Sequence, residues 1–462
     1  MQSTDRTAGG AVRAFLDEYL SKTRQFSRNA NLYVLHVIGM DMIHGSWEIL
    51  FNLYLLAIGF DIKFIGLRLV VQGIARAATA VPAGLASDRW GRKTSFILGD
   101  GMGAILGLVQ ISTRSEAMLL AVPAFGAFFG NLHHTAEPAF MAENSKREER
   151  VHLFAVAGSL RTFSAMTGAL LAGLIPALLI DSVGKVDAYR IATYAGLALW
   201  FLSLIPAFML RTFEAEERPD EDLARVSPPD TGQSRVAQWR PGRLMAGVTH
   251  RRRIAFFVLT SGIVSFGYGA VGPLFAVAFH EGHLHIEETG LSFMFAAGEL
   301  GLAAATLLVP LLASRMLKVD AIVATRLLAV PFVIGMGVLP LWMGEGQLVI
   351  LLVGASYVGR TTIFRMSGPL DDAFNMEVLD ARERATNTGI EIAVGGAMSA
   401  IAIWIGSRLL DSGDFTTPFL IMAGCYVIST MIYRDAFQSL EISEERARAD
   451  AAAADIVAGG GS

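Results

Sequence analysis

The ten residues Gly84-Leu85-Ala86-Ser87-Asp88-Arg89-Trp90-Gly91-Arg92-Lys93 form a short charged turn between two long apolar runs. Glycine occurs near both ends of the turn, an acid lies in its middle and basic residues follow the acid. The segments on either side are too apolar for a soluble protein. We therefore expect a tight loop at a membrane surface, and this loop indicates how the chain is threaded through the membrane.

The composition of the whole chain agrees with this expectation. Of its 462 residues, 53% are hydrophobic and only 17% are charged, whereas soluble domains carry about a quarter charged residues. Apolar runs of roughly 20 residues, long enough to cross a bilayer, recur along most of the chain. The composition indicates an all-α membrane protein with many spans. Cys425 is the only cysteine, so an intrachain disulfide is excluded.

Hydropathy predicts twelve transmembrane helices in two sets of six, with a polar segment between the sets. The predicted spans are 31–59, 63–85, 94–113, 116–141, 151–180, 189–210, 254–281, 287–313, 320–343, 346–370, 384–409 and 416–434. The expected regions are an N-terminal arm over 1–29, a six-helix bundle over 30–210, a linker over 211–253, a second bundle over 254–435 and a largely disordered tail over 436–462. The arm is expected to form either an amphipathic helix on the membrane surface or a solvated basic tail.

Lysine and arginine are concentrated in alternate loops. The arm, the 84–93 turn, the linker and the loops at 142–150, 314–319 and 378–384 carry them, whereas the loops between these carry few. Loops rich in these residues face the cytoplasm. Each half then has an even number of spans and both termini are cytoplasmic. We expect an integral protein of a bacterial inner membrane.

A weak internal repeat supports the division into halves. The fourth span is followed by Glu143 and, seven positions later, Arg150, and the tenth span is followed by Glu377 and, seven positions later, Arg384. A proline lies upstream in both places. The repetition at the same point of each half indicates a duplicated unit.

The turn at 84–93 resembles a known loop signature. Gly84-x-x-x-Asp88-Arg89-x-Gly91-Arg92-Lys93, between the second and third of twelve spans, is similar to the signature of the major facilitator superfamily. With the central linker and the duplicated halves, the resemblance covers nearly the whole chain. It implies two pseudo-symmetric six-helix bundles, with a substrate site between them at mid-membrane that opens to each side in turn.

The resemblance also implies a cytoplasmic gate. Asp88 is expected to face the start of the eleventh span near 384–387, where a carboxylate meets the positive end of a helix dipole. Arg92 is expected to pair with Glu143 at the foot of the fourth span. The expected gate residues are Gly84, Asp88, Arg89, Gly91, Arg92, Lys93 and Glu143. For Arg89 and Lys93, a role in topology alone is an equal alternative.

The sequence departs from the family in ways that leave the subfamily open. The corresponding turn of the second half, near 310–318, has no acid. The fourth and fifth spans lack the patterns typical of proton-driven drug exporters. A drug/proton antiporter is therefore compatible with the sequence but is not specifically indicated.

The first predicted span carries three ionisable residues on one stripe. Asp41, His44 and Glu48 fall at positions i, i+3 and i+7, and Asn52 extends the stripe. Ionisable groups inside a span mark pathways or pair with one another. Burial and a neighbouring acid both favour the protonated form of a carboxyl group, so protons could load and leave near physiological pH. We expect a proton- or cation-coupling site, with a structural network paired to a buried arginine as the alternative.

The fourth and fifth spans carry charges that could join this site. His134 and Glu137 share a face of the fourth span, and His133 is adjacent. Two adjacent histidines cannot both point inward, so one of them is expected to pack. Arg161 in the fifth span is expected to neutralise Glu137 or Asp41.

The second half carries buried charges of its own. Arg360 and Arg365 lie in the tenth span, and Glu299 and Glu391 lie in the eighth and eleventh. These positions suggest charges that meet across a central cavity. Arg360 or Arg365 is expected either to bind an anionic group of the substrate or to form a salt bridge with Glu391.

His280, His283 and His285 lie with several acids in a predicted outer loop. Imidazole and carboxylate groups are metal ligands, so a metal site is one interpretation of this stretch. No second cluster matches it, and a structural site needs about four ligands. We expect no metal and no cofactor, and a proton gradient as the source of energy.

These features indicate a secondary transporter, proton-coupled, for a small amphipathic or anionic organic solute, with export of a drug or metabolite favoured. One alternative is a lysolipid or nutrient uptake transporter of the same fold, and another is a non-transporting membrane sensor or scaffold. The buried charge at Asp41 argues against a scaffold. No nucleophile–base pair or nucleotide-binding motif indicates an enzyme. The expected partners of this monomer are its solute, protons and membrane lipids, and no nucleic acid.

Overall fold

A computed structural model describes residues 26–211 and 249–459, and a few side chains within these ranges, including Glu48, lie outside the described part. The surface helix predicted for the arm and most of the predicted linker also lie outside the described residues. The described chain is helical throughout its regular elements.

Six helices form the first half of the molecule, which we call the N-half. They are α2 (Arg28–Ala57), α3 (Ile62–Trp90), α4 (Arg92–Ser112), α5 (Glu116–Glu143), α6 (Arg147–Val183) and α7 (Lys185–Phe208). Local chemistry sets several of their ends. The Ser27 hydroxyl accepts a hydrogen bond from the N–H of Ala30 (3.1 Å) and caps α2. Gly91, with φ of 85°, ends α3 and allows the chain to reverse into α4.

The second half, the C-half, also forms six spans, two of which are interrupted. Its elements are α11 (Arg251–Gly269), η2 (Gly272–Leu274), α12 (Phe275–Glu281), α13 (Glu288–Ala313), α14 (Lys318–Met343), α15 (Gln347–Arg365), α16 (Ser367–Val378), α17 (Ala381–Asp411) and α18 (Thr417–Gly459). Pro273 lies in the break between α11 and α12, where it cannot donate a helical hydrogen bond. The predicted fold of two six-helix bundles is confirmed.

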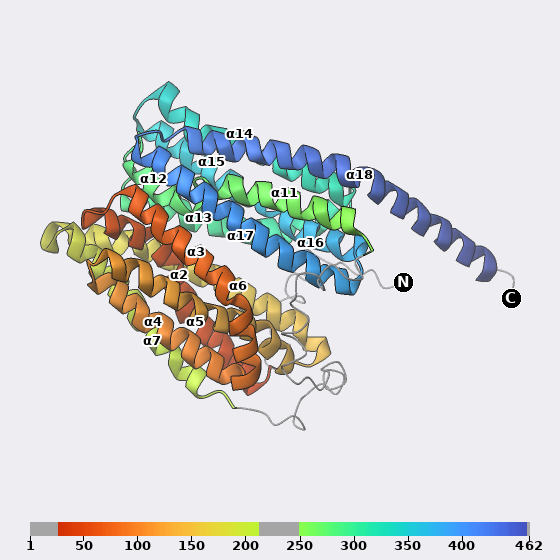
Figure 1. Cartoon of the computed structure of the whole chain (residues 1–462), viewed down its shortest axis with the longest axis horizontal. Coiled ribbons are helices and arrows are strands. Elements are labelled where there is room, and N and C mark those ends of the chain that lie inside the picture. The colour runs from red at the N-terminus through yellow and green to blue at the C-terminus, as the bar shows by residue number, and fades with distance from the viewer. Residues whose placement is uncertain (1–25, 212–248, 460–462) are drawn as a thin grey trace, which may run out of the picture.

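Nine helices of the described chain are long and apolar enough to cross a membrane by length and composition. The other three full-length helices, α2, α5 and α13, lie among them in the same bundles (Figure 1). Two of these, α2 and α5, carry the buried ionisable residues described below. The chain is an integral membrane protein.

The two bundles touch at one end of the molecule and diverge at the other (Figure 1). We call the end that carries the 84–93 turn the motif end, and the other the opposite end. At the opposite end one apolar cluster includes residues of both halves, such as Tyr54 and Phe275. At the motif end each half has a separate cluster, around Phe96 in the N-half and Phe257 in the C-half. The two halves therefore share an apolar core at the opposite end and have separate cores at the motif end.

Polar contacts also join the halves at the opposite end. Lys63 of α3 forms an ion pair with Asp411 of α17 (Nζ–Oδ2 2.6 Å). Glu288 at the start of α13 pairs with Lys185 (3.4 Å) and accepts a hydrogen bond from the hydroxyl of Tyr189. α6 packs along α13, and α3 along α17. These contacts close the opposite end.

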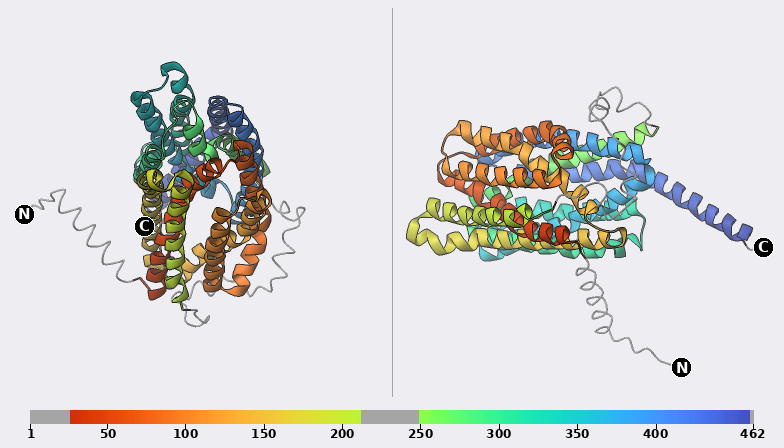
Figure 2. Two further views of the ribbon diagram at one scale, coloured as in Figure 1. Left: turned by 90° about the vertical axis from the view of Figure 1, so that its left-hand side faces the viewer. Right: turned by 90° about the horizontal axis from the view of Figure 1, so that it is seen from below.

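The prediction of a disordered tail is wrong for residues 436–459. α18 continues to Gly459 and projects beyond the bundles (Figures 1 and 2). Its last turns are rich in alanine, glutamate and arginine, which have high helix propensity. Glu441 anchors the extension, because its carboxylate accepts hydrogen bonds from the N–H groups of Lys318 and Val319 (both 2.8 Å) and so caps α14.

Candidate functional site

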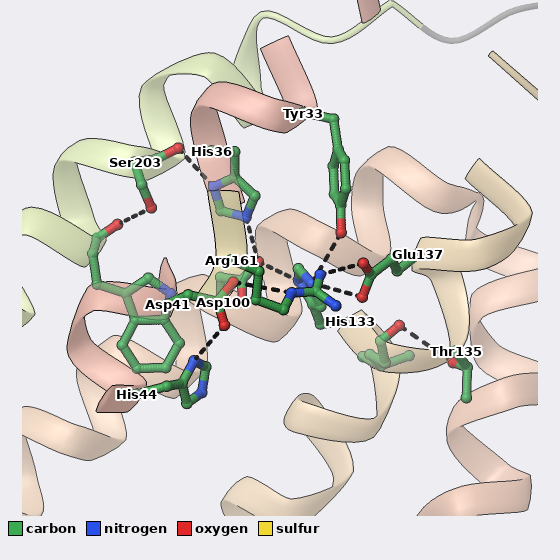
Figure 3. A network of polar contacts seen from close by, with 12 residues as sticks. Tyr33, His36, Asp41, His44, Asp100, His133, Thr135, Glu137, Arg161 and Ser203 are labelled. Carbon is green, nitrogen blue, oxygen red and sulfur yellow. Dashed lines mark hydrogen bonds and ion pairs between the residues drawn. The ribbon is translucent and has the colours of Figure 1, made fainter. Parts of the chain in front are cut away.

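The N-half contains an arginine held between two acids from different helices (Figure 3). Nε of Arg161, on α6, donates to Oδ2 of Asp41 on α2 (3.1 Å), and its terminal nitrogen donates to Glu137 on α5. Both carboxylates are buried, whereas the Arg161 side chain is 37% exposed. The predicted neutralisation of these acids by Arg161 is confirmed as a contact.

A second carboxylate lies beside this group. Oδ2 of Asp100, on α4, contacts Nε2 of His36 and Nδ1 of His133 at 2.8 Å each (Figure 3). Nδ1 of His36 lies 2.7 Å from the carbonyl oxygen of Ser203, so this nitrogen must carry a proton. Both nitrogens of His36 therefore face acceptors. The Asp100 carboxyl group thus joins two histidines from different helices.

The two groups are continuous through His133. Its Nε2 lies 3.4 Å from the Tyr33 hydroxyl and 4.0 Å from Oε2 of Glu137. At the other side of Asp41, Nδ1 of His44 lies 3.9 Å from Oδ1. We call the residues His36, Asp41, Asp100, His133, Glu137 and Arg161 the N-half network. It draws charged side chains from α2, α4, α5 and α6.

The adjacent histidines of α5 differ in burial, and the cavity role predicted for His134 stays a prediction. His133 is buried in the network, and His134 is exposed in the absence of lipid and lines the neighbouring cavity. The rotation of α5 decides this, and the sequence alone does not give it. His36 and Asp100 were missed, although an acid inside the apolar third span was a usable signal. The side chain of Glu48 lies outside the described residues.

The C-half has a buried arginine in a different setting. Arg360 is 5% exposed and lies over the rings of Tyr268 (5.3 Å), Phe275 (5.7 Å), Phe364 (5.4 Å) and Tyr426 (5.7 Å). It donates a hydrogen bond to the Tyr426 hydroxyl, and its Nε has no hydrogen-bond partner. Aromatic faces attract a guanidinium but do not neutralise it.

The alternative of a salt bridge between Arg360 and Glu391 is wrong, because Arg360 forms no ion pair within the described chain. Arg365 is exposed and Glu391 is partly buried. The ion pair on neighbouring helices is instead Arg326 with Asp371 (3.1 Å). The roles predicted for Arg365 and Glu391 stay predictions.

The gate turn is held by its own residues. Arg92 pairs with Asp88 (2.8 Å) and with Glu143 at the end of α5 (3.6 Å), so the predicted Arg92–Glu143 pair is confirmed. Lys93 donates to the carbonyl of Leu210 (2.7 Å), and Arg89 is exposed. The contact of Asp88 with the start of α17 stays a prediction for a state closed at the motif end. At Gly84 a Cβ would meet open space in this state.

The internal repeat is visible in the structure. Arg150 donates to the carbonyl of Ala142, and Arg384 donates to the carbonyl of Met376, in both cases eight residues earlier. The two halves therefore use the same contact to close the loop after their fourth span.

Two groups within the described residues bring three potential metal ligands together, His36–Asp100–His133 and His250–Asp380–Glu383. Hydrogen bonds among their own atoms already link the first group. The histidines of the outer loop have separate partners. His280 contacts Lys185 (3.1 Å) and the carbonyl of Ile286, and the His283 ring packs against Phe415. The described chain does not gather His280, His283 and His285 into one ligand set.

The chain resembles known transporters in sequence pattern and in fold. The family model described as Major Facilitator Superfamily matches residues 33–368. A comparison with curated proteins found no match. Among solved structures, a mutant of the nucleoside transporter NupG has a TM-score of 0.70 at 15% identity, and the match covers 89% of this chain and 100% of that one.

Two further structures show the same fold. A D-xylose-proton symporter has a TM-score of 0.65 at 14% identity, covering 87% of this chain and 96% of that chain. A bacterial homologue of the iron transporter ferroportin, in an inward-facing state, has a TM-score of 0.66 at 11% identity, covering 88% and 98%. The family match spans well over half of the sequence, and the chain belongs to the Major Facilitator Superfamily of secondary transporters.

Proposed function

We propose that the protein moves a small amphipathic or anionic organic solute by alternating access, driven by protons that bind in the N-half network. The observation that carries the proposal is the bridge of Arg161 between Asp41 and Glu137. One guanidinium faces two carboxylates, so the trio carries a net negative charge when both acids are ionised. A proton on either acid makes the trio neutral.

The network is placed to affect the movement of the halves. Protonation of Asp41 or Glu137 would release one hydrogen bond of Arg161 and loosen α6 against α2 or α5. α6 is also the helix that packs on α13 across the contact between the halves. A proton can therefore bias the balance between two conformations, because it binds them with different affinity. Asp100 is hydrogen-bonded to His133, and Nε2 of His133 lies 4.0 Å from Glu137, so in our proposal this histidine relays protons towards Glu137.

The fold supports this coupling by analogy. One structural neighbour is a D-xylose-proton symporter, although at this identity the likeness concerns the fold alone. In our proposal the motif end faces the cytoplasm of a bacterium, and the described conformation is open to that side. Export of a drug or metabolite is the proposed direction; the geometry of the network serves export and uptake equally.

Transport in proteoliposomes tests the proposal. Wild-type protein, Asp41→Asn and a control, Asp181→Asn, are given an imposed pH gradient and a panel of labelled organic solutes. Asp181 is an exposed acid near the end of α6. We expect the pH gradient to drive solute flux in wild type and in the control. In Asp41→Asn, the rate of solute flux should not depend on the gradient.

Two results would count against the proposal. Solute flux that is insensitive to both the gradient and the Asp41 substitution would remove proton coupling. Absence of solute flux and of proton movement, with ligand-dependent changes of conformation retained, would favour the sensor over the transporter.

A further inference from the structure

A cavity lies beside the N-half network. Its volume is about 440 Å³, and its walls come from α2, α3, α4, α5 and α7, with α11, η2, α12 and α13 of the C-half at one side. Its polar lining residues are His44, Asn52, Arg68, Gln72, Arg76, Asp100, Gln110, His133 and His134. A cavity of this size falls within the range of small-molecule sites.

Arg68 is the unusual residue of this lining. It is only 2% exposed, and its Nε has no hydrogen-bond partner. Its terminal nitrogen donates to Oε1 of Gln110 (3.0 Å), and its guanidinium lies 4.4 Å from the centre of the Phe51 ring. Neither neighbour carries a negative charge. A buried charge without a counter-charge is strongly unfavourable, and a donor without an acceptor adds to this.

The remaining charges of the lining do not compensate Arg68. Arg76 also lines the cavity. Asp100 is the acid that lines the cavity, and its Oδ2 is held by His36 and His133 at 2.8 Å each. Within the described residues, Arg68 therefore has no carboxylate among its hydrogen-bond and cation–π partners, and its charge favours a negatively charged occupant.

The apolar walls show what shape such an occupant would have. Two indole rings, of Trp47 and Trp200, lie over glycines of α4, and a Cβ at Gly103 would lie 2.6 Å from the Trp200 ring. Only glycine leaves room for the ring at that position. The Nε1 of Trp200 is buried and has no acceptor. The cavity thus offers flat aromatic faces, and an unpaired indole N–H lies buried in its wall.

We propose that this cavity binds an organic carboxylate with a flat apolar body, whose carboxylate group pairs with Arg68. The Nε–H of Arg68 supplies the free donor, and the amide of Gln110 is oriented with its oxygen towards the guanidinium, so its NH₂ group remains available as a donor. Trp47 and Trp200 contact the flat body. A guanidinium matches the two oxygens of a carboxylate in geometry and charge.

The inference deepens the proposed function, on which it rests for the statement that the bound anion is transported. The cavity shares Asp100 and His133 with the N-half network. Anion binding at Arg68 would raise the negative charge beside these groups and so favour proton uptake. This would couple solute and proton.

Binding of 1-naphthoate to the purified full-length protein in nanodiscs tests the site, with the neutral 1-naphthamide and naphthyl phosphate as comparison probes. Calorimetry and the fluorescence of Trp47 and Trp200 report binding. The variants are Arg68→Gln, Trp200→Phe and a control, Arg434→Gln, which removes an exposed arginine on α18. Thermal melts check that each variant is folded.

We expect wild type and Arg434→Gln to bind naphthoate at least about tenfold more tightly than naphthamide, since charge-assisted hydrogen bonds contribute roughly 1.5–3 kcal/mol and 1.4 kcal/mol is a factor of ten. Arg68→Gln should lose this preference, and Trp200→Phe should weaken binding by a smaller factor. Equal affinity for acid and amide in wild type, or naphthoate binding unchanged in folded Arg68→Gln, would overturn the site. Tighter binding of the phosphate than of the carboxylate would overturn the carboxylate assignment.

The wild-type comparison of acid and amide does not depend on any variant folding. Binding without gradient-driven flux would contradict the proposed function and leave the site in place. Gradient-driven flux of an uncharged solute with no binding of naphthoate would contradict the site and leave the proposed function in place.

Discussion

The two halves of this transporter share a fold but treat a buried arginine in opposite ways. In the N-half, Arg161 is held by the carboxylates of Asp41 and Glu137. In the C-half, Arg360 lies among four aromatic rings and has no carboxylate partner in the described chain. In the first arrangement, a proton can bind to one of the two carboxylates and remove its negative charge. The second keeps a fixed positive charge, because an arginine does not lose its proton.

The comparison shows that two bundles of one fold can carry different kinds of buried charge. The N-half network contains acids and histidines, and two of them line the cavity at Arg68. The C-half contributes a constant charge whose neighbours Tyr268 and Phe275 line one side of that cavity. The pseudo-symmetry of the fold therefore does not extend to its electrostatics.

The largest expected effect is that of Arg161→Met. This substitution leaves two buried acids without their cation. Removing one partner of a buried ion pair costs about 3–5 kcal/mol, and the partial exposure of Arg161 reduces the figure to roughly 1–3 kcal/mol. Unfolding of the protein in mild detergent, followed by tryptophan fluorescence, measures the change.

The matched control for Arg161→Met is Arg365→Met, which removes an exposed arginine. Adding Asp41→Asn and Glu137→Gln to Arg161→Met should restore most of the stability, since no unpaired charge remains. A triple variant as unstable as the single one would show that Arg161 acts through packing.

The second prediction concerns the C-half, where loss of the buried arginine is not expected to lower the free energy of unfolding. Arg360→Met removes a buried charge that no acid compensates, and its long apolar side chain retains contact with the rings. We expect the free energy of unfolding to stay equal or to rise by about 1 kcal/mol, because the lost cation–π attraction is smaller than the desolvation penalty that is relieved. The same unfolding assay measures it. A loss of more than about 2 kcal/mol would contradict the description of Arg360 as uncompensated.

The sequence predicted the fold and part of this contrast, and the reasons are physical. Length, hydropathy and the 84–93 turn determine the twelve spans, because a lipid environment permits few backbone structures. Asp41, Glu137 and Arg161 were predicted because a charged residue inside an apolar run can be recognised from the sequence alone. Their contact with the hub at Asp100 was not, since that hub is assembled from three helices whose rotations come from packing.

Other misses have similar causes. Arg68 lies only two turns from the start of α3. An arginine at such a position commonly reaches the membrane surface, so the sequence did not indicate a buried charge there. The choice of Tyr426 over Glu391 as partner of Arg360 depends on how α15 sits against α17 and α18. The helical tail was not predicted, although its alanine, glutamate and arginine residues favour helix.

A smaller effect is expected where the halves meet. Glu288 of the C-half is held by Lys185 and Tyr189 of the N-half, so this acid closes the opposite end. Glu288→Gln should weaken that contact and raise access to the opposite end. In a Cys425→Ser background, maleimide labelling of Ser407→Cys, which packs near Gly66, should become a few times faster. The control Glu281→Gln removes an exposed acid nearby, and equal rates in both variants would exclude a closing role for Glu288.

The smallest effect compares equivalent positions of the internal repeat. Glu383 of the C-half corresponds to Glu149 of the N-half. Burial raises the pKa of Glu383, but hydrogen bonds from the N–H and ring of His250 and from the N–H of Thr249 outweigh this effect and lower the pKa to about 2. A depressed carboxyl pKa stabilises the folded state above the pKa of the unfolded chain, and this stabilisation is lost as the pH falls towards the folded value.

Glu383→Gln should therefore lower the melting temperature in detergent by about 2–4 °C at pH 7 and by less at pH 3.5, because the unfolded carboxylate is protonated by then and wild type has lost part of its advantage. Glu149→Gln should change the melting temperature less at both pH values, since its side chain has no equivalent of the His250 contact in the described chain. A deficit of Glu383→Gln that grows as the pH falls would mean that the carboxylate is not the form that holds His250. The C-half would then resemble the N-half at this loop, and the electrostatic difference between the halves would be confined to their buried arginines.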